Sequence, residues 1–253
     1  MPALFWVFEA AVAGSILAYL FAGIRDLKPR WAAILLSIGA GSAWGIGVSS
    51  CFFFVGRMVI GDAPVLMQGL EVAAVVIAIV IDLRSRQKPE VRSEDRISKL
   101  NLILAGTLVV VLSIGIAAMA RPWNANPHGS WDGWEDWNMR ARFFAAPGDL
   151  FRRAWSPLIP THAEYPLLIP AFLARCWRYG NETPQSVPIA TDYLLFLAAV
   201  CAGTGGIAAL RSQSLGLLFG LSLASTPFFL FQVPWLYADT SVAAYALTAV
   251  ILL

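Results

Sequence analysis

The sequence has little charge: only 13% of its 253 residues are Asp, Glu, Lys or Arg, whereas 58% are hydrophobic. Globular domains ordinarily carry about 25% charged residues, so this composition excludes an ordinary soluble protein and indicates a membrane protein. The formal net charge of +2 is small and the two signs are nearly balanced, which excludes nucleic acid as an expected partner.

Cysteine and histidine are scarce as well. The three cysteines, Cys51, Cys176 and Cys201, form no CxxC pattern and no Cys/His spacing, so the sequence predicts neither a disulfide framework nor a zinc site. The two histidines, His128 and His162, are too few for a His-rich metal site. We also find no internal repeat and no low-complexity tract.

Long apolar runs dominate the chain. A bilayer core about 30 Å thick requires roughly 20 apolar residues per helix, and runs of about this length predict an all-α, polytopic membrane helical bundle. The predicted spans are 3–24, 31–55, 64–82, 100–120, 190–210, 214–234 and 240 onward. The last of them holds too few residues to cross a bilayer, which predicts a chain truncated at its C-terminus.

Two acids lie inside predicted spans near the amino terminus. Glu9 is in the first span, and no basic residue precedes it, which favours a retained span over a cleaved signal peptide. Glu71 is an isolated acid in the third span. Buried carboxylates in membrane helices are often functional. Because Glu71 lies near the start of its helix, we expect instead that it reaches the interface.

The basic residues predict the orientation of the chain. With the amino terminus outside, ten of the eighteen Lys and Arg residues lie in cytoplasmic segments, and only Arg57 lies in the short outer loop. The segment 121–189 is long enough to cross the membrane whatever its charge. We therefore expect an integral membrane protein, with this segment on the periplasmic or extracellular side.

This pattern divides the chain into three regions. Residues 1–82 form an N-terminal three-span segment, residues 83–99 a charged cytoplasmic linker, and residues 100–253 the region with the polar motifs. Within the last region, the external segment 121–189 holds six of the ten tryptophans. Indole favours the headgroup zone, and Pro and Gly cut the segment into short pieces. We therefore expect helices that lie on the membrane surface.

The stretch WDGWEDWNMRARFF, residues 131–144, concentrates ionisable groups in this segment. On an α-helix, its three tryptophans would form one stripe, and Asp132, Glu135 and Asp136 would stack on a neighbouring face. Asp136 and Arg140, four residues apart, could pair. That would leave Asp132 as the least neutralised acid and as a candidate general base. The alternative is an interfacial amphipathic helix whose acids are merely solvated.

This stretch, followed by HAEYPLLIPAFLARCWRYGNETP and then by YADTSVAAY, resembles the bacterial members of the GT-C superfamily of membrane glycosyltransferases. That superfamily includes protein mannosyltransferases and lipid A aminoarabinose transferases. The resemblance covers about residues 100–253 and implies a GT-C-like fold, here incomplete. It also implies a hexosyl- or pentosyl-type transferase that moves a sugar, with inversion, from a polyprenyl-phosphate carrier to a lipid, glycan or protein acceptor.

The resemblance also assigns residues. Asp132 corresponds to the family's catalytic aspartate, and Asp239 in the YAD motif is similar to its second acidic site. The family's Asp-Glu doublet reads Asp-Gly here, and its His-Pro-Asp-Tyr-Pro pattern reads HAEYP. The first departure leaves the base open among Asp132, Glu135 and Asp136.

The remaining expected site residues bind substrate. Arginine suits bidentate phosphate contacts, so arginines near the acids could stabilise the departing lipid phosphate. For Arg152 and Arg153 the alternative is nonspecific binding of headgroups. The expected substrate-binding residues are Arg140, Arg142, Arg152, Arg153, His162, Glu164, Tyr165 and Asp239. A divalent cation could bridge the acids and the phosphate, and no other cofactor or metal is indicated.

Two other functions stay open at this point. A polytopic transporter or a lipid-binding membrane scaffold would have a similar composition, but transporters tend to place charges at the midplane and to show internal repeats. Here the acids gather near the outer surface. An inactive glycosyltransferase fragment is the third reading, favoured by the abrupt end of the chain.

Overall fold

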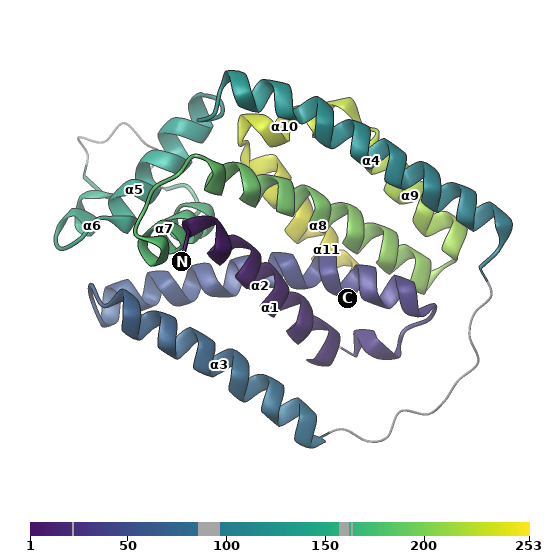
Figure 1. Ribbon diagram of the computed structural model, residues 1–253, viewed down its shortest axis with the longest axis horizontal. Helices are drawn as coiled ribbons and strands as arrows, with labels where there is room; N and C mark the ends of the chain where they lie inside the picture. Colours follow the sequence, from purple (N-terminus) through teal and green to yellow (C-terminus); the bar gives the residue numbers. More distant parts are fainter. Residues whose placement is uncertain (22, 86–96, 157–161, 163) are drawn as a thin grey trace.

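The computed structural model describes residues 1–21, 23–85, 97–156, 162 and 164–253. Over these residues the chain is all-helical and has no strand (Figure 1). The elements are α1 (Ala3–Phe21), η1 (Ile24–Asp26), α2 (Arg30–Val59), α3 (Pro64–Ser85), α4 (Lys99–Ala125), η2 (Gly133–Met139), α5 (Arg140–Ala145), α6 (Leu150–Arg153), α7 (Leu168–Gly180), α8 (Ser186–Leu210), α9 (Gln213–Ala224), α10 (Pro227–Trp235) and α11 (Ala238–Leu252).

Several of these helices are long and apolar enough to cross a membrane. In the part of the chain that the structure describes, five helices qualify singly: α1, α2, α3, α4 and α8. The pair α9 and α10 qualifies only when taken together, and the two helices are bent by 57°. The chain is therefore an integral membrane protein of helical type, as its composition predicts.

The span predicted over 214–234 is a bent pair of helices, α9 and α10, and not one straight helix. Pro227 begins α10, and Thr226 before it has a ψ of 111°, which is outside the helical range. The ring of a proline disfavours helical backbone in the preceding residue, so the chain leaves the helix and restarts it. The helix α11 has 15 residues and is shorter than a membrane span.

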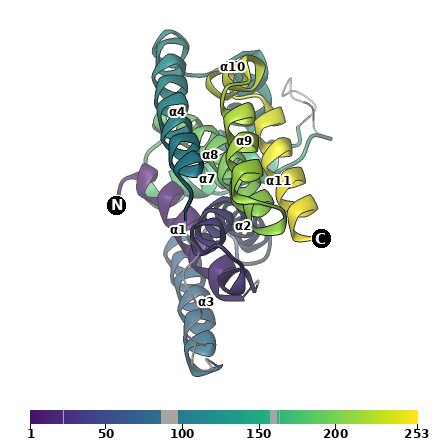
Figure 2. The same ribbon diagram turned by 90° about the vertical axis from the view of Figure 1, so that its right-hand side faces the viewer.

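The centre of the bundle is α2, which packs along both α1 and α8 (Figures 1 and 2). Small residues allow this contact. A Cβ on Gly39 would lie 2.2 Å from the backbone nitrogen of Ala202, and one on Gly205 would lie 2.5 Å from the carbonyl oxygen of Ala32. Backbones of membrane helices approach this closely where glycine and alanine line the interface.

The helices α3 and α4 lie at opposite edges of this bundle (Figures 1 and 2). Only 6% of the spanning window of α3 and 17% of that of α4 are buried within the protein. Their side chains are mostly large and apolar, so lipid is the medium that these two helices face. The contacts of α3 with the rest of the protein run to α1, α2 and α7.

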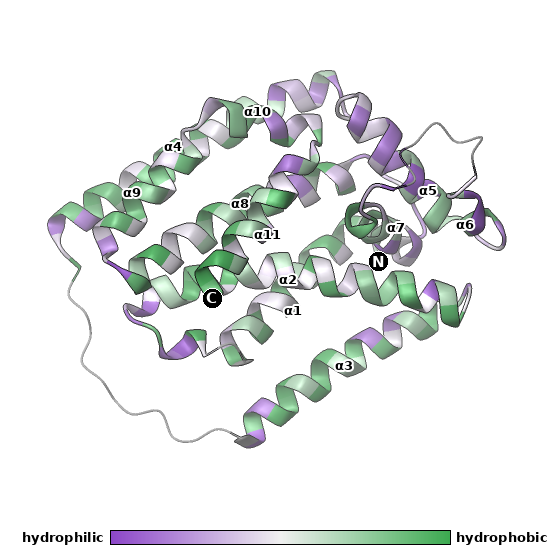
Figure 3. Cartoon of the chain, turned by 180° about the vertical axis from the view of Figure 1, so that it is seen from behind, coloured by the Kyte–Doolittle hydropathy of each residue, from purple (hydrophilic) through white to green (hydrophobic). Residues whose placement is uncertain are grey.

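The connecting helices η2, α5, α6 and α7 gather at one end of the bundle, which we call the loop end. Hydrophilic residues concentrate there, whereas the spanning helices are mostly hydrophobic (Figure 3). An aromatic cluster of Phe54, Phe144, Phe151 and Trp155 joins α2, α5 and α6, with ring centroids 5.2–6.0 Å apart. Short helices cut by proline and glycine were predicted for this segment, and the structure has them.

The helix α7 departs from the prediction of membrane-surface helices. It packs against α1, α2 and α5, and most of its residues, including Phe172, Leu173 and Trp177, are buried in the protein. Its apolar side chains therefore contact protein and not lipid. The hydroxyl of Ser50 on α2 donates to the carbonyl oxygen of Leu168 at 2.6 Å and fixes the start of α7 on the bundle.

Candidate functional site

Residues 131–145 form one continuous helix whose middle part, η2, is a π-helix. π-Helical turns are rare in proteins, and those that occur are often found at functional sites. The π-helical spacing corrects the predicted tryptophan stripe. Trp131 is 72% exposed and Trp134 40% exposed, but Trp137 is 6% exposed. The three indoles therefore do not share one face, because the wider turn changes the angle between successive side chains.

Asp132 lies in the first turn of this helix and is half-buried. Its side chain makes no capping hydrogen bond, and among the described residues no ion pair to its carboxylate occurs. The partial positive charge at a helix N-terminus favours an ionised carboxylate. Glu135 is half-buried as well. Asp132 thus keeps its lone pairs free of hydrogen bonds to the described residues.

The carboxylate of Asp136, in contrast, is engaged by other groups of the protein. It is 5% exposed, and its Oδ1 accepts the backbone N–H of His162 at 3.2 Å. Arg140, 1% exposed, donates to the carbonyl oxygens of His162 and, at 3.4 Å, of Tyr165. Burial lowers the pKa of Arg140, and the nearby charge of Asp136 opposes this effect. The charges of Asp136 and Arg140 interact, and both side chains hold the backbone of His162.

His162 and Tyr165 therefore lie against the helix of residues 131–145, which we call the acidic helix. His162 Nδ1 is 2.9 Å from Glu164 Oε1, and both side chains are exposed. This hydrogen bond raises the pKa of His162 above its ordinary value. The His162 ring stacks on Tyr165 at 4.4 Å between centroids, and Tyr165 stacks on Trp137 at 5.7 Å. The structure thus brings His162, Glu164 and Tyr165 to the helix that carries the predicted acids.

The predicted arginines fall into two environments. The guanidinium of Arg142 lies over the rings of Trp134 and Trp177, 5.8 and 5.4 Å from their centroids, and its buried Nε has no hydrogen-bond partner. A guanidinium held between indoles has donors left for an anion. Arg152 and Arg153 are exposed on the short helix α6, without a described ion pair.

Asp239 is exposed in the first turn of α11, and the turn before it packs on the acidic helix. A Cβ on Gly133 would lie 2.9 Å from the Leu236 Cβ and 3.1 Å from the carbonyl oxygen of Trp235. Leu236 has a φ of 58°, a conformation that costs energy for a residue with a side chain. The segments that carry Asp132 and Asp239 are therefore adjacent at the loop end.

A second cluster of ionisable residues was missed in the sequence. Arg175 on α7 has no exposed surface, and its Nη2 is 2.6 Å from Glu9 Oε2 and 2.9 Å from Glu71 Oε1. Its Nε donates to both oxygens of Glu71 at 3.0 Å, and its Nη1 donates to the carbonyl oxygen of Trp6 at 3.0 Å. The expectation that Glu71 reaches the interface is wrong: it is 9% exposed and paired with Arg175 inside the protein.

Asp192 on α8 was missed as well. It is 4% exposed, and its Oδ2 has no hydrogen-bond partner among the described residues. A carboxylate in that position is costly unless it is neutralised. An acid inside the long apolar run 190–210 was the signal in the sequence that could have identified it.

Metal binding has no preformed site in the described residues: no group of three or more His, Cys, Asp or Glu side chains is placed to hold an ion there. Comparisons of the chain with protein-family models, with curated proteins and with solved structures gave no match. The function is therefore argued from the site itself.

Proposed function

We propose that this protein is a glycosyltransferase of the bacterial inner membrane. It transfers a sugar from a polyprenyl-phosphate carrier to a lipid, glycan or protein acceptor at the outer face, with inversion. The observation that carries the proposal is the packing of the acidic helix on the turn before Asp239, with Gly133 against Leu236. This contact brings two acidic motifs, far apart in the sequence, to the end of the bundle where a lipid-linked donor would present its sugar.

The environment of the acids favours Asp132 as the general base. Deprotonating an acceptor hydroxyl requires a carboxylate with a free lone pair close to the reacting atoms. Asp136 has its Oδ1 engaged by the backbone of His162 and interacts with Arg140. Asp132 makes no such hydrogen bond and lies at a helix start. Glu135, half-buried one turn later, stays the rival.

The departing lipid phosphate needs positive charge as its own charge develops. Arg142 suits this role, because it is half-buried between two indoles and its guanidinium makes no hydrogen bond to the described residues. Arg140 is less suited, since it is buried and donates to backbone carbonyls. The exposed Arg152 and Arg153 would contact headgroups of the carrier or of surrounding lipid.

The test is sugar transfer by the full chain in membranes, using a panel of polyprenyl-phosphate-linked sugars. Asp132→Asn keeps the shape but cannot accept the proton, so we expect a loss of about 10²- to 10⁴-fold in rate. Asp149→Asn is the matched control, because Asp149 is an exposed acid of the same segment, and it should keep full activity. Full activity of Asp132→Asn would refute the base assignment, and loss in Glu135→Gln alone would move it to Glu135.

A second candidate function is a transporter or lipid-binding scaffold, and the buried Arg175 cluster favours it. Ionisable groups inside a membrane bundle often mark a substrate or ion pathway. In that case Glu9→Gln would abolish function, whereas Asp132→Asn would leave it unchanged. Glycosyl transfer predicts the reverse order of sensitivity for these two variants.

A further inference from the structure

With both of its carboxylates ionised, the Arg175 cluster would carry one uncompensated negative charge. One guanidinium faces two carboxylates, those of Glu9 and Glu71, and its donors are occupied by these two groups and by the carbonyl oxygen of Trp6. A single carboxylate would neutralise Arg175. Uncompensated charge in a low-dielectric interior costs several kcal/mol, so the second carboxylate calls for a cation or a proton.

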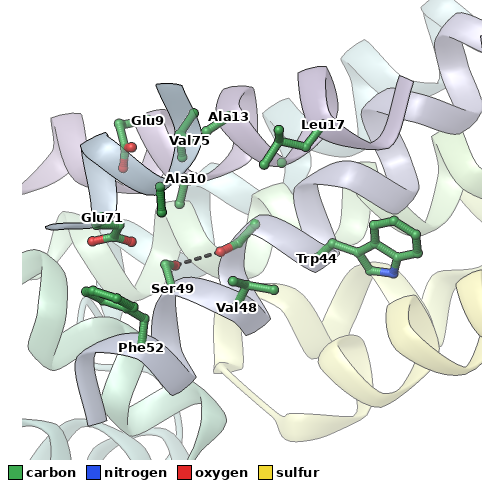
Figure 4. Close-up of a pocket in the computed structure, with 13 residues that line it drawn as sticks. Glu9, Ala10, Ala13, Leu17, Trp44, Val48, Ser49, Phe52, Glu71 and Val75 are labelled. Atoms are coloured by element: carbon green, nitrogen blue, oxygen red, sulfur yellow. Dashed lines mark hydrogen bonds between the residues drawn. The ribbon is translucent and has the colours of Figure 1, made fainter. Parts of the chain in front are cut away.

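A groove begins at these two carboxylates. A cavity of about 210 Å³ lies between α1, α2 and α3, with Glu9 and Glu71 at one end and Leu17 and Trp44 at the other (Figure 4). Its remaining walls are apolar or small, from Ala13, Val48, Phe52, Ala74 and Val75 among others. From Glu9 to Leu17 the helix rises by about 12 Å at 1.5 Å per residue.

The groove is open on its lipid side. The helix α3 forms one wall and is scarcely buried, and it makes few contacts with α1 and α2. The side chains of Glu9 and Glu71 keep 20% and 11% of their surface exposed. An acyl-type chain could therefore enter between the helices from the bilayer without opening the bundle.

We propose that this groove binds an amphiphile with a primary amine at its head and a single hydrocarbon chain. The ammonium group lies on the carboxylates of Glu9 and Glu71, and the chain lies along Ala13, Leu17 and Val48. Charge decides the head group: one added positive charge balances the cluster, whereas a phosphate or carboxylate head would add to its excess negative charge. This site is distinct from the acidic helix, and the proposal does not depend on glycosyl transfer.

The test compares three probes of equal chain length: dodecylamine, 1-dodecanol and dodecyl phosphate. Binding to the full chain in nonionic detergent is measured by native mass spectrometry. We expect dodecylamine to bind at least tenfold more tightly than the other two. Glu9→Gln should remove this preference and leave the weak binding of dodecanol unchanged. Equal affinity for the amine and the alcohol, or preference for the phosphate, would overturn the proposal. A proton on one of the two carboxylates would then neutralise the cluster.

Two neighbouring alanines on α3 locate the binding site. Both alanines are exposed, but Ala74 lines the groove and Ala73 does not. Ala74→Phe fills the groove and should weaken dodecylamine at least tenfold, while Ala73→Phe should have no effect. If Ala74→Phe does not fold, Ala13→Leu on the opposite wall makes the same test. Unchanged affinity in the folded filling variant would place the amine elsewhere and refute the proposal.

Discussion

The carbonyl oxygen of Ala10 occupies the space of a side chain at Gly45: a Cβ built there would lie 1.9 Å from it. No real Cβ contact is that short, so α1 and α2 must separate if any side chain is added. Overpacking of this kind costs about 1–3 kcal/mol. We expect Gly45→Ala to lower the Tm by several degrees, measured by thermal unfolding in detergent.

The matched control for this substitution is Gly69→Ala on α3. A Cβ at Gly69 would meet nothing within 4 Å. Alanine favours the helix by about 0.5–1 kcal/mol over glycine, so this variant should be neutral or more stable. Equal losses in the two variants would show that the α1–α2 contact does not limit stability.

Removing Arg175 should destabilise the protein more than any surface charge. Arg175→Met leaves the half-buried Glu9 and the buried Glu71 without their cation, at a cost of about 3–5 kcal/mol. The triple variant Arg175→Met with Glu9→Gln and Glu71→Gln removes all three charges and should recover most of the Tm. Arg211→Met, an exposed arginine at the end of α8, is the control. If the triple variant does not recover, the packing of Arg175 on the rings of Trp6, Phe172 and Tyr179, and not its charge, stabilises the protein.

The spanning helices were predictable because their signal is local. A run of apolar residues of membrane length has one stable outcome in lipid, a helix that satisfies its own backbone. The break at Pro227 could also have been predicted, because a Thr-Pro pair lies inside the run 214–234. It was missed because the run was assigned as one span from its hydropathy alone.

The Arg175 cluster was not predictable in the same way. Glu9 and Glu71 are separated from Arg175 by 166 and 104 residues, and no periodicity connects them. Each residue alone has an ordinary explanation, and only the packing of α7 on α1 and α3 brings them together. The π-helix is a further case, because it changes which side chains share a face, and it buries Asp136 with Trp137 instead of exposing a row of acids.

Asp62 links the loop end to α2 and should make stability depend on pH. Its Oδ1 accepts from Arg57 at 2.6 Å and from Arg178 at 2.7 Å. Burial alone would raise the pKa of Asp62, but the hydrogen bond from Arg178 and the charges of both arginines outweigh it and hold the pKa below its ordinary value of 3.8.

The sign of the effect follows from this lowered pKa. Stabilisation by Asp62 is complete above its unfolded pKa of 3.8 and is lost as the pH falls through the lower folded pKa. At neutral pH, Asp62→Asn should therefore cost about 1–3 kcal/mol. The difference in Tm from the parent should shrink below about pH 4. Asp149→Asn should show neither effect, and a difference in Tm that stays constant at acid pH would exclude this linkage.

Asp192 offers the opposite outcome, a substitution that stabilises. Its Oδ2 is buried without a partner, and burying an unsatisfied polar group costs about 1–3 kcal/mol. Leucine has a similar shape and no polar atom, so Asp192→Leu should raise the Tm. Thr191→Val, the neighbouring control, removes a hydroxyl that donates to the carbonyl oxygen of Val187 at 2.8 Å and should lower the Tm slightly. A lower Tm in Asp192→Leu would show that the carboxyl group is satisfied in the membrane, and the cost assigned to it here would be withdrawn.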